Sequence, residues 1–263
     1  MIIVIVVLVL LMVQLAAMGW MGGLGPMKFL AAVRMGRIPG NAKEYHLDNV
    51  RPRDESPLQG KTICFLGSSV TFGAASLGVS MADYIGVLDG CKIIKEAVSG
   101  TTMAGTDAST YVSRLLKNID VNADIDIFVS QLSTNDASKG LPLGKVSSGT
   151  ELRDFDRETV IGAMETIIAY VRDTWDCDIV FYTGTRYESK AYAAMVDALL
   201  ALRDKWGIGV IDLWNDVEMN AVSEGDYSLF MNDKIHPTQA GYLKWWVPKF
   251  QEALYARVKK RPQ

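Results

Sequence analysis

Five short apolar runs alternate with longer amphipathic stretches between residues 60 and 263, and this alternation constrains the fold more than any other feature. The runs are residues 62–66, 92–98, 125–132, 179–183 and 210–213. Short and nearly continuous apolar runs are typical of strands that are buried on both faces. The stretches between them repeat apolar residues three and four apart, which is typical of helices with one buried side. The sequence therefore predicts an α/β fold, a three-layer α/β/α sandwich with a central, mostly parallel five-stranded sheet.

The first of these strands leads directly into a turn of small residues. Thr62–Leu66 is followed by Gly67-Ser68-Ser69. In an open α/β sheet, ligands bind at the carboxyl ends of the strands, where this turn is expected to lie. A serine in that place can act as a nucleophile if a neighbouring base takes its proton. The chain has two histidines, His46 and His236, so there are two candidates for the base.

The second candidate site is the stretch Asn232–Thr238, which contains Asp233 and His236. Two residues three apart in one turn can face each other. A carboxylate that accepts from one imidazole nitrogen leaves the other nitrogen able to take a hydroxyl proton. Asp233 or Thr238 can also be explained as a cap of the last helix, with His236 merely adjacent. From these residues alone, both interpretations stay open.

Four short blocks of the sequence resemble, in order and spacing, those of the SGNH hydrolases, the superfamily of GDSL-type serine esterases. The blocks are Gly67–Ser69, Val98–Thr102, Leu132–Asp136 and Asp233–Pro237. The resemblance implies an SGNH-hydrolase or flavodoxin-like domain. It also implies a Ser-His-Asp triad and an oxyanion hole formed by the Ser69 N–H, the Gly100 N–H and the side-chain amide of Asn135. The triad would consist of Ser69, His236 and Asp233.

Two positions depart from the family pattern. Ser68 stands where the family usually has aspartate before the nucleophile, and Ser133 stands where it usually has glycine in the third block. Neither position supplies a triad or oxyanion group, so the departures bear on subfamily and substrate rather than on mechanism. Other motifs do not match: the Gly67–Gly73 turn lacks the lysine of a phosphate-binding loop, and position 71 is not the glycine of a Gly-x-Ser-x-Gly elbow.

The resemblance implies a serine-dependent carboxylic ester hydrolase acting on a small-molecule ester with a small, acetyl-like acyl group, such as an acylated carbohydrate. Two alternatives stay open: an acyltransferase that uses the same triad, and a non-catalytic, membrane-anchored binding domain. No metal or other cofactor is expected, because the acidic residues and the two histidines have no metal-ligand spacing. The net charge of −3 gives no sign of nucleic-acid binding. The oligomeric state and the natural substrate stay open.

The N-terminal segment differs in kind from the rest of the chain. Residues 1–24 contain one clearly polar side chain, Gln14. About 20 apolar residues are enough to cross a bilayer, so this segment is expected to be an uncleaved, single-span transmembrane anchor that attaches the protein to a membrane. Lys28 and Arg34 follow the segment and no basic residue precedes it, which favours a cytoplasmic domain. A tethered hydrolase is more often expected outside the cell, so the side of the membrane stays open.

Residues 25–59 are expected to be a juxtamembrane segment and linker, because they are rich in charges and hold three prolines after residue 38. His46 lies in this segment and is expected to have no catalytic role. Residues 60–263 are expected to form the hydrolase domain. A long polar stretch within it, residues 136–159, predicts a loop that either borders the substrate pocket or is simply a surface loop. Arg186 and Tyr187, after the fourth strand, are further candidates to face the site.

Overall fold

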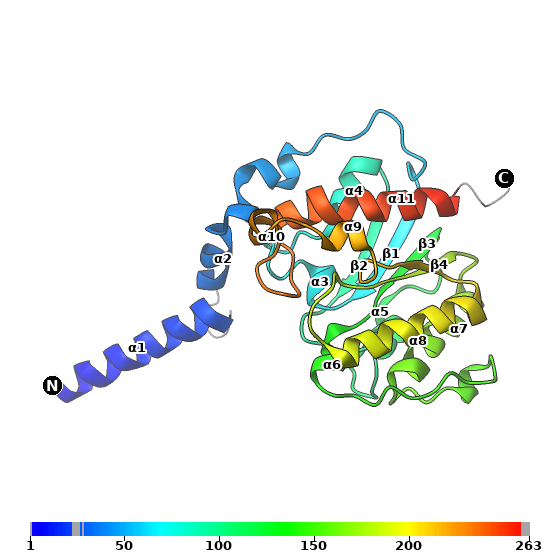
Figure 1. The fold of residues 1–263 in the computed structure, drawn as a ribbon. Helices are drawn as coiled ribbons and strands as arrows, with labels where there is room; N and C mark the ends of the chain where they lie inside the picture. The colour runs from blue at the N-terminus through cyan, green and yellow to red at the C-terminus, as the bar shows by residue number, and fades with distance from the viewer. Residues whose placement is uncertain (1, 23–26, 28, 259–263) are drawn as a thin grey trace.

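The computed structural model describes residues 2–22, 27 and 29–258, and its centre is a five-stranded sheet (Figure 1). All neighbouring strands in it are parallel, in the order β2-β1-β3-β4-β5. The strands are β1 (Thr62–Gly67), β2 (Lys92–Ala97), β3 (Ile127–Gln131), β4 (Asp178–Tyr182) and β5 (Gly209–Ile211). This confirms the predicted five-stranded parallel sheet. Its strand order is the flavodoxin-like one, in which the chain changes direction between β1 and β3.

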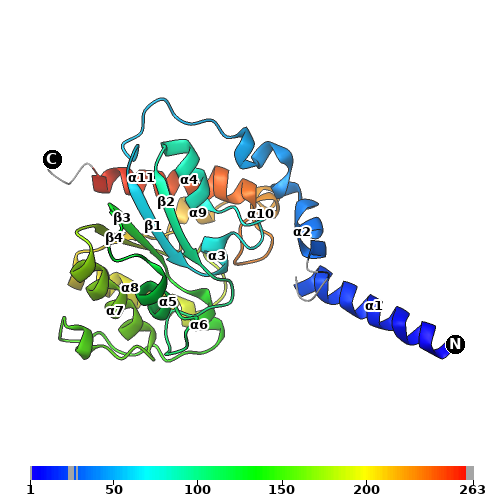
Figure 2. The same ribbon diagram turned by 180° about the vertical axis from the view of Figure 1, so that it is seen from behind.

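Helices cover both faces of the sheet, as the two opposite views show (Figures 1 and 2). One apolar core lies between the sheet and three helices, α5 (Tyr111–Asn118), α7 (Val160–Thr174) and α8 (Lys190–Trp206). A second core lies on the other face, under α4 (Met81–Asp89) and α11 (Val247–Val258). This arrangement agrees with the predicted three-layer α/β/α fold, because each amphipathic helix buries its apolar side against a strand face.

Shorter elements occupy the connections between the layers. The short α-helices are α3 (Ser69–Phe72), α6 (Thr134–Ser138), α9 (Val217–Asn220) and α10 (Glu224–Phe230). A π-helix, Gly241–Trp246, runs into α11. Within the described residues, single turns of 3₁₀-helix are formed by Pro39–Asn41, Lys43–Tyr45, Leu47–Asn49 and Leu152–Asp154. α3 and α6 directly follow β1 and β3, so both begin at the carboxyl edge of the sheet.

The N-terminal helix α1 (Ile2–Gly22) extends away from the domain in both views (Figures 1 and 2). Helix α2 (Phe29–Gly36) lies between α1 and the domain. In the part of the chain that the structure describes, none of the helices has the length and apolar character needed to span a bilayer. The transmembrane anchor predicted over residues 1–24 is therefore not supported. Residues 1, 23 and 24 of that range lie outside the described residues. The location of the protein in the cell stays a prediction.

The segment before β1 packs against the domain at several points. The Asn41 side chain donates to the carbonyl oxygen of Ala75 (2.8 Å) and accepts from the backbone N–H of Gln239 (2.9 Å). The Tyr84 hydroxyl donates to the carbonyl oxygen of Tyr45 (2.6 Å). Asn41 and Tyr45 are both buried. This segment therefore contributes side chains to the packed structure. The division of the chain at residues 24 and 59 stays a prediction.

Candidate functional site

Three loops meet at the carboxyl edge of the sheet. Ser69 begins α3 just after β1, Gly100 follows β2, and Asn135 lies in the first turn of α6 after β3. These three strands are parallel neighbours, so their carboxyl ends lie side by side. Polar groups from three separate segments are thereby gathered at the place where open α/β sheets bind ligands.

The serine contacts the second histidine of the chain. Ser69 Oγ lies 2.8 Å from His236 Nε2, and His236 Nδ1 lies 2.9 Å from Asp233 Oδ2. An ionised carboxylate can only accept hydrogen bonds, so Nδ1 carries the hydrogen and Nε2 is left to accept from the Ser69 hydroxyl. The structure therefore brings these three predicted residues together. The other histidine, His46, contacts the carbonyl oxygen of Asn41 (3.2 Å) in the segment before β1.

A closed loop holds the aspartate and the histidine in place. Met231 pairs with Pro237 in an antiparallel bridge at its base. Asp233 Oδ1 accepts from the backbone N–H groups of Ile235 (2.8 Å) and His236 (2.9 Å). Partial burial raises the pKa of the Asp233 carboxyl. The hydrogen bond from the His236 side chain, the charge of His236 and the two backbone N–H groups together lower this pKa by more than burial raises it. The pKa of Asp233 therefore lies well below its ordinary value, and the carboxylate is ionised.

Gly100 and Asn135 are held by contacts between their loops. Gly100 has φ of +80°, a backbone conformation that favours glycine, and a Cβ there would meet no atom within 4 Å. Asn135 Nδ2 donates one hydrogen to the carbonyl oxygen of Thr101 (2.9 Å). An amide of this kind has two hydrogens, so that bond uses half of its donors. Lys139 Nζ donates to the carbonyl oxygen of Gly100 (2.8 Å). The two loops are therefore tied to each other at the edge of the sheet.

Gln131, which sequence reasoning missed, fixes the turn that carries the serine. It is buried at the end of β3, and its Oε1 accepts from the Ser68 N–H (2.9 Å) and the Thr71 hydroxyl (2.8 Å). The Thr71 N–H and the Ser68 hydroxyl lie somewhat farther from the same oxygen, at 3.3 Å and 3.4 Å. A polar residue inside an apolar run must find hydrogen-bond partners when it is buried. The position of Gln131 inside the run 125–132 is therefore the sequence signal that could have identified it.

Two further charged residues brace the same edge. Buried Arg114 donates to the carbonyl oxygen of Gly67 (2.8 Å) and to the Thr101 hydroxyl (3.2 Å). Buried Asp136 accepts from the backbone N–H groups of residues 103 and 104 (2.8 and 2.9 Å). Burial raises the pKa of the Asp136 carboxyl, although these donors oppose the rise. Both side chains join the loop after β2 to a neighbouring element, so they fix the relative positions of the loops.

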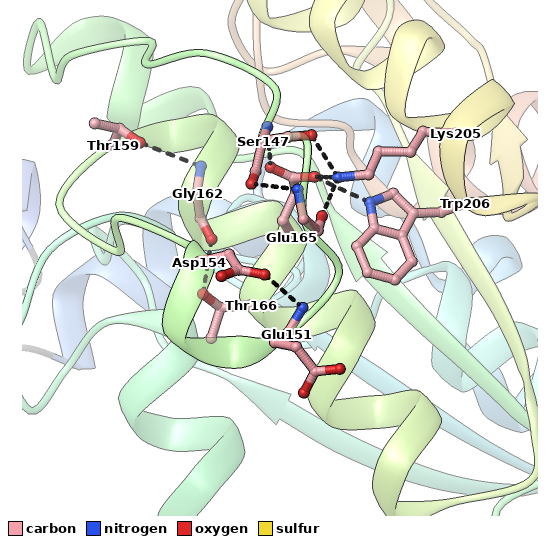
Figure 3. A network of polar contacts seen from close by, with 10 residues as sticks. Ser147, Glu151, Asp154, Thr159, Gly162, Glu165, Thr166, Lys205 and Trp206 are labelled. Carbon is pink, nitrogen blue, oxygen red and sulfur yellow. Dashed lines mark hydrogen bonds and ion pairs between the residues drawn. The ribbon is translucent and has the colours of Figure 1, made fainter.

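The long loop after α6 is anchored elsewhere, on α7 and α8 (Figure 3). Glu165 is fully buried, and its Oε1 lies 2.5 Å from Lys205 Nζ. Lys205 Nζ also donates to the carbonyl oxygens of Ser147 (2.7 Å) and Gly149 (2.6 Å). The Ser147 N–H and the Trp206 indole donate to the Glu165 carboxylate. One buried ion pair therefore fixes the middle of this loop to the helix layer.

Comparison with known proteins gives a match to one protein family. Residues 63–246 match the family described as GDSL-like lipase/acylhydrolase, which is more than half of the chain. No functionally curated protein matches the sequence. Among solved structures, a protein from Lactobacillus plantarum has a TM-score of 0.60 at 17% identity, over 78% of this chain and 99% of its own.

Two other structures carry functional descriptions. One is a possible lipase from Chitinophaga pinensis, with a TM-score of 0.54 at 17% identity over 76% of this chain and 98% of its own. The other is a family two carbohydrate esterase from Clostridium thermocellum, in complex with cellohexaose, with a TM-score of 0.53 at 14% identity over 80% and 65%. At such identities the likeness concerns the fold alone. The family match over residues 63–246 shows more: this chain is a hydrolase and belongs to the GDSL-like lipase/acylhydrolase family of the SGNH superfamily.

Proposed function

We propose that this protein is a serine-dependent carboxylic ester hydrolase in which Ser69 is the nucleophile, His236 the base and Asp233 its partner. The observation that carries the proposal is the continuous chain of contacts from Ser69 Oγ to His236 Nε2 (2.8 Å) and from His236 Nδ1 to Asp233 (2.9 Å). A serine hydroxyl becomes a useful nucleophile when an adjacent base with a fixed tautomer takes its proton. The ionised state of Asp233 supports that tautomer.

In the first half of the reaction, Ser69 Oγ attacks the ester carbonyl carbon while its proton passes to His236 Nε2. Asp233 stabilises the imidazolium that forms, and His236 then gives the proton to the leaving alcohol. In the second half, water takes the place of the alcohol and releases the acyl group from Ser69. The bonds formed and broken balance in each half, and no further reactant is needed.

Negative charge develops on the carbonyl oxygen in both halves, and three donors are proposed to stabilise it. These are the backbone N–H groups of Ser69 and Gly100 and the remaining amide hydrogen of Asn135. Donors fixed before the reaction are effective because they need no reorganisation as charge develops. The hydrogen bonds that Asn135 donates to Thr101 and that Lys139 donates to Gly100 support this role, because they fix the two loops relative to each other.

The substrate class proposed is esters of small acyl groups, with acylated carbohydrates as the leading candidates. A fold shared with a carbohydrate esterase is compatible with this choice. The fold alone does not define a substrate, so the proposal rests on the site and is tested there.

Labelling with a fluorophosphonate probe tests the nucleophile. Wild-type protein and Ser68→Ala are expected to label, and Ser69→Ala is expected not to, which makes the neighbouring serine a matched control. Hydrolysis of 4-nitrophenyl acetate should follow the same pattern. Labelling of Ser69→Ala at the wild-type rate would show that another residue is the nucleophile. If the wild-type protein neither labels nor cleaves any short ester, the esterase proposal is wrong and the alternative of a non-catalytic binding domain replaces it.

A further inference from the structure

A small cavity lies near the carboxyl ends of β3 and β4, next to the turn that carries the proposed nucleophile. Four of its lining residues directly adjoin Ser69, Asn135, Asp233 or His236 in sequence, although none of these site residues lines it: Val70, Thr134, Lys234 and Ile235. Thr185 and Tyr187, from the connection between β4 and α8, line it as well. The cavity therefore lies among the residues that flank the proposed site.

The cavity is very small. Its volume is about 10 Å³. A space of this size holds about one water molecule, or a group of similar size. The lining combines the aliphatic side chains of Val70 and Ile235 and the ring of Tyr187 with polar residues such as Gln131 and Thr134. A small apolar group suits the apolar part of this lining. The methyl group of an acetyl ester is such a group, whereas a butyryl chain would need the wall to move.

The cavity suits the acyl side of an ester better than the alcohol side. The leaving alcohol must depart before water can enter, so it needs an open path to solvent. The acyl group stays bonded to the nucleophile through both halves of the reaction. A cavity too small for more than one group can hold the end of the acyl chain throughout, but it offers no exit for an alcohol.

Tyr187 forms a firm part of the wall. Its ring lies 5.3 Å from the ring of Tyr192 and 5.3 Å from that of Trp214. Lys234 Nζ lies 5.9 Å from the centre of the Tyr187 ring. Burial raises the pKa of the Tyr187 hydroxyl to about 12, so the ring carries no charge at neutral pH. Moving this side chain aside would break three contacts at once, so the wall does not readily yield to a longer acyl chain.

We infer that this cavity receives the methyl group of acetyl esters and that Tyr187 sets the upper limit on acyl length. The inference rests on the function proposed above and names the acyl group that the same site accepts. It assigns to Tyr187 a specificity role, not a part in proton transfer.

The test compares kcat/KM for 4-nitrophenyl acetate, butyrate and octanoate in wild-type protein, Tyr187→Ala and Tyr187→Phe. One methylene in a closely fitting apolar pocket changes kcat/KM by about 10- to 200-fold, so the wild type should prefer acetate over butyrate by at least about 10-fold. Tyr187→Ala should lower this ratio by about 10-fold or more, through faster butyrate cleavage. Tyr187→Phe keeps the ring and should keep the wild-type preference.

A second variant tests the cavity from the opposite direction and does not disturb the aromatic contacts. Gly184 also lines the cavity. A Cβ added there would meet only Tyr192 Oη at 3.8 Å, an ordinary contact, so Gly184→Ala should fold normally. Because Gly184 lines the cavity, the added methyl group is expected to reduce its space, and kcat/KM for acetate should then fall by about 10-fold. This variant supplies the test if Tyr187→Ala does not fold.

The outcomes separate the inference from the function on which it rests. A wild type that cleaves butyrate or octanoate as fast as acetate would overturn the inference and leave the proposed function standing. The same holds if neither Tyr187→Ala nor Gly184→Ala changes the acyl preference or the acetate rate. A wild type that cleaves no ester and does not label would overturn the proposed function itself.

Discussion

Two acid–base pairs in this protein make similar contacts in opposite surroundings. Asp233 and His236 lie 2.9 Å apart in a loop at the edge of the sheet, with side chains 46% and 26% exposed. Glu165 and Lys205 lie 2.5 Å apart between α7 and α8, where the Glu165 side chain is fully buried. The first pair leaves one nitrogen directed at Ser69. In the second pair, both partners also bond to the long loop or to Trp206.

Under the proposed function, this difference explains why the same chemistry serves reaction in one place and stability in the other. A buried ion pair whose remaining donors and acceptors are also bonded holds its surroundings in one arrangement. It offers no atom to a substrate. A pair at the surface gives little stability, because water competes with it, but it can exchange protons with a bound molecule. We expect substitutions in the first pair to change rates and substitutions in the second to change stability.

The largest effect is expected from His236→Ala. Removal of the base of a serine triad lowers kcat on the order of 10⁶-fold. The free energy of unfolding should change little, because the side chain lies partly in solvent. The matched control is His46→Ala, the other histidine of the chain, which should keep wild-type kcat. Both variants are assayed with 4-nitrophenyl acetate and by urea unfolding. Near-wild-type turnover by His236→Ala would mean that another group is the base.

The next effect is expected from Lys205→Met, which leaves the Glu165 carboxylate buried without its cation. Loss of one partner from a buried pair destabilises a protein by about 3–5 kcal/mol. Arg203→Met, two residues earlier on α8, removes a cation from an exposed pair with Asp204 and should leave the free energy of unfolding nearly unchanged. Under conditions where both variants are folded, both should retain wild-type kcat. If Lys205→Met and Arg203→Met had the same free energy of unfolding in urea, the buried Glu165–Lys205 pair would contribute no more stability than an exposed pair, contrary to this account.

The smallest effect is a pH dependence of stability from Asp233. Its pKa in the folded protein lies below the ordinary value. A carboxyl of this kind adds stability above its unfolded pKa, and the contribution is lost as the pH falls towards its folded pKa. The difference in unfolding free energy between wild type and Asp233→Asn should therefore be larger at pH 7 than at pH 3. Solvent exposure keeps the difference small. A difference that grew as the pH fell would contradict this account.

Most of the sheet could be predicted from the sequence, because its strands are short apolar runs with no competing interpretation. The predicted run 62–66 ends one residue before β1 does, and the run 179–183 is displaced by one residue from β4. The run 125–132 extends beyond β3 at both ends, since residues that flank a strand are often apolar too. The N-terminal segment was judged by apolar composition alone, and the anchor predicted from it is not supported.

The candidate site could be predicted in part. Ser69, Gly100, Asn135, Asp233 and His236 follow from four matching blocks, and the structure brings Ser69, Asp233 and His236 into contact. Gln131 and Arg114 could not be found in this way, because what they do depends on atoms of distant segments. Gln131 accepts from a turn about 60 residues earlier in the chain, and no local pattern records such a contact.

The contact between Ser69 and His236 joins residues 167 positions apart, and this separation has a consequence for biosynthesis. Proteins emerge from the ribosome from the N-terminus onward, so the hydroxyl is present long before the imidazole is made. A nascent or prematurely terminated chain thus carries an ordinary, unreactive alcohol. Under the proposed mechanism, reactivity arises only once the final loop has closed over the finished sheet, which ties the onset of activity to completion of the whole domain.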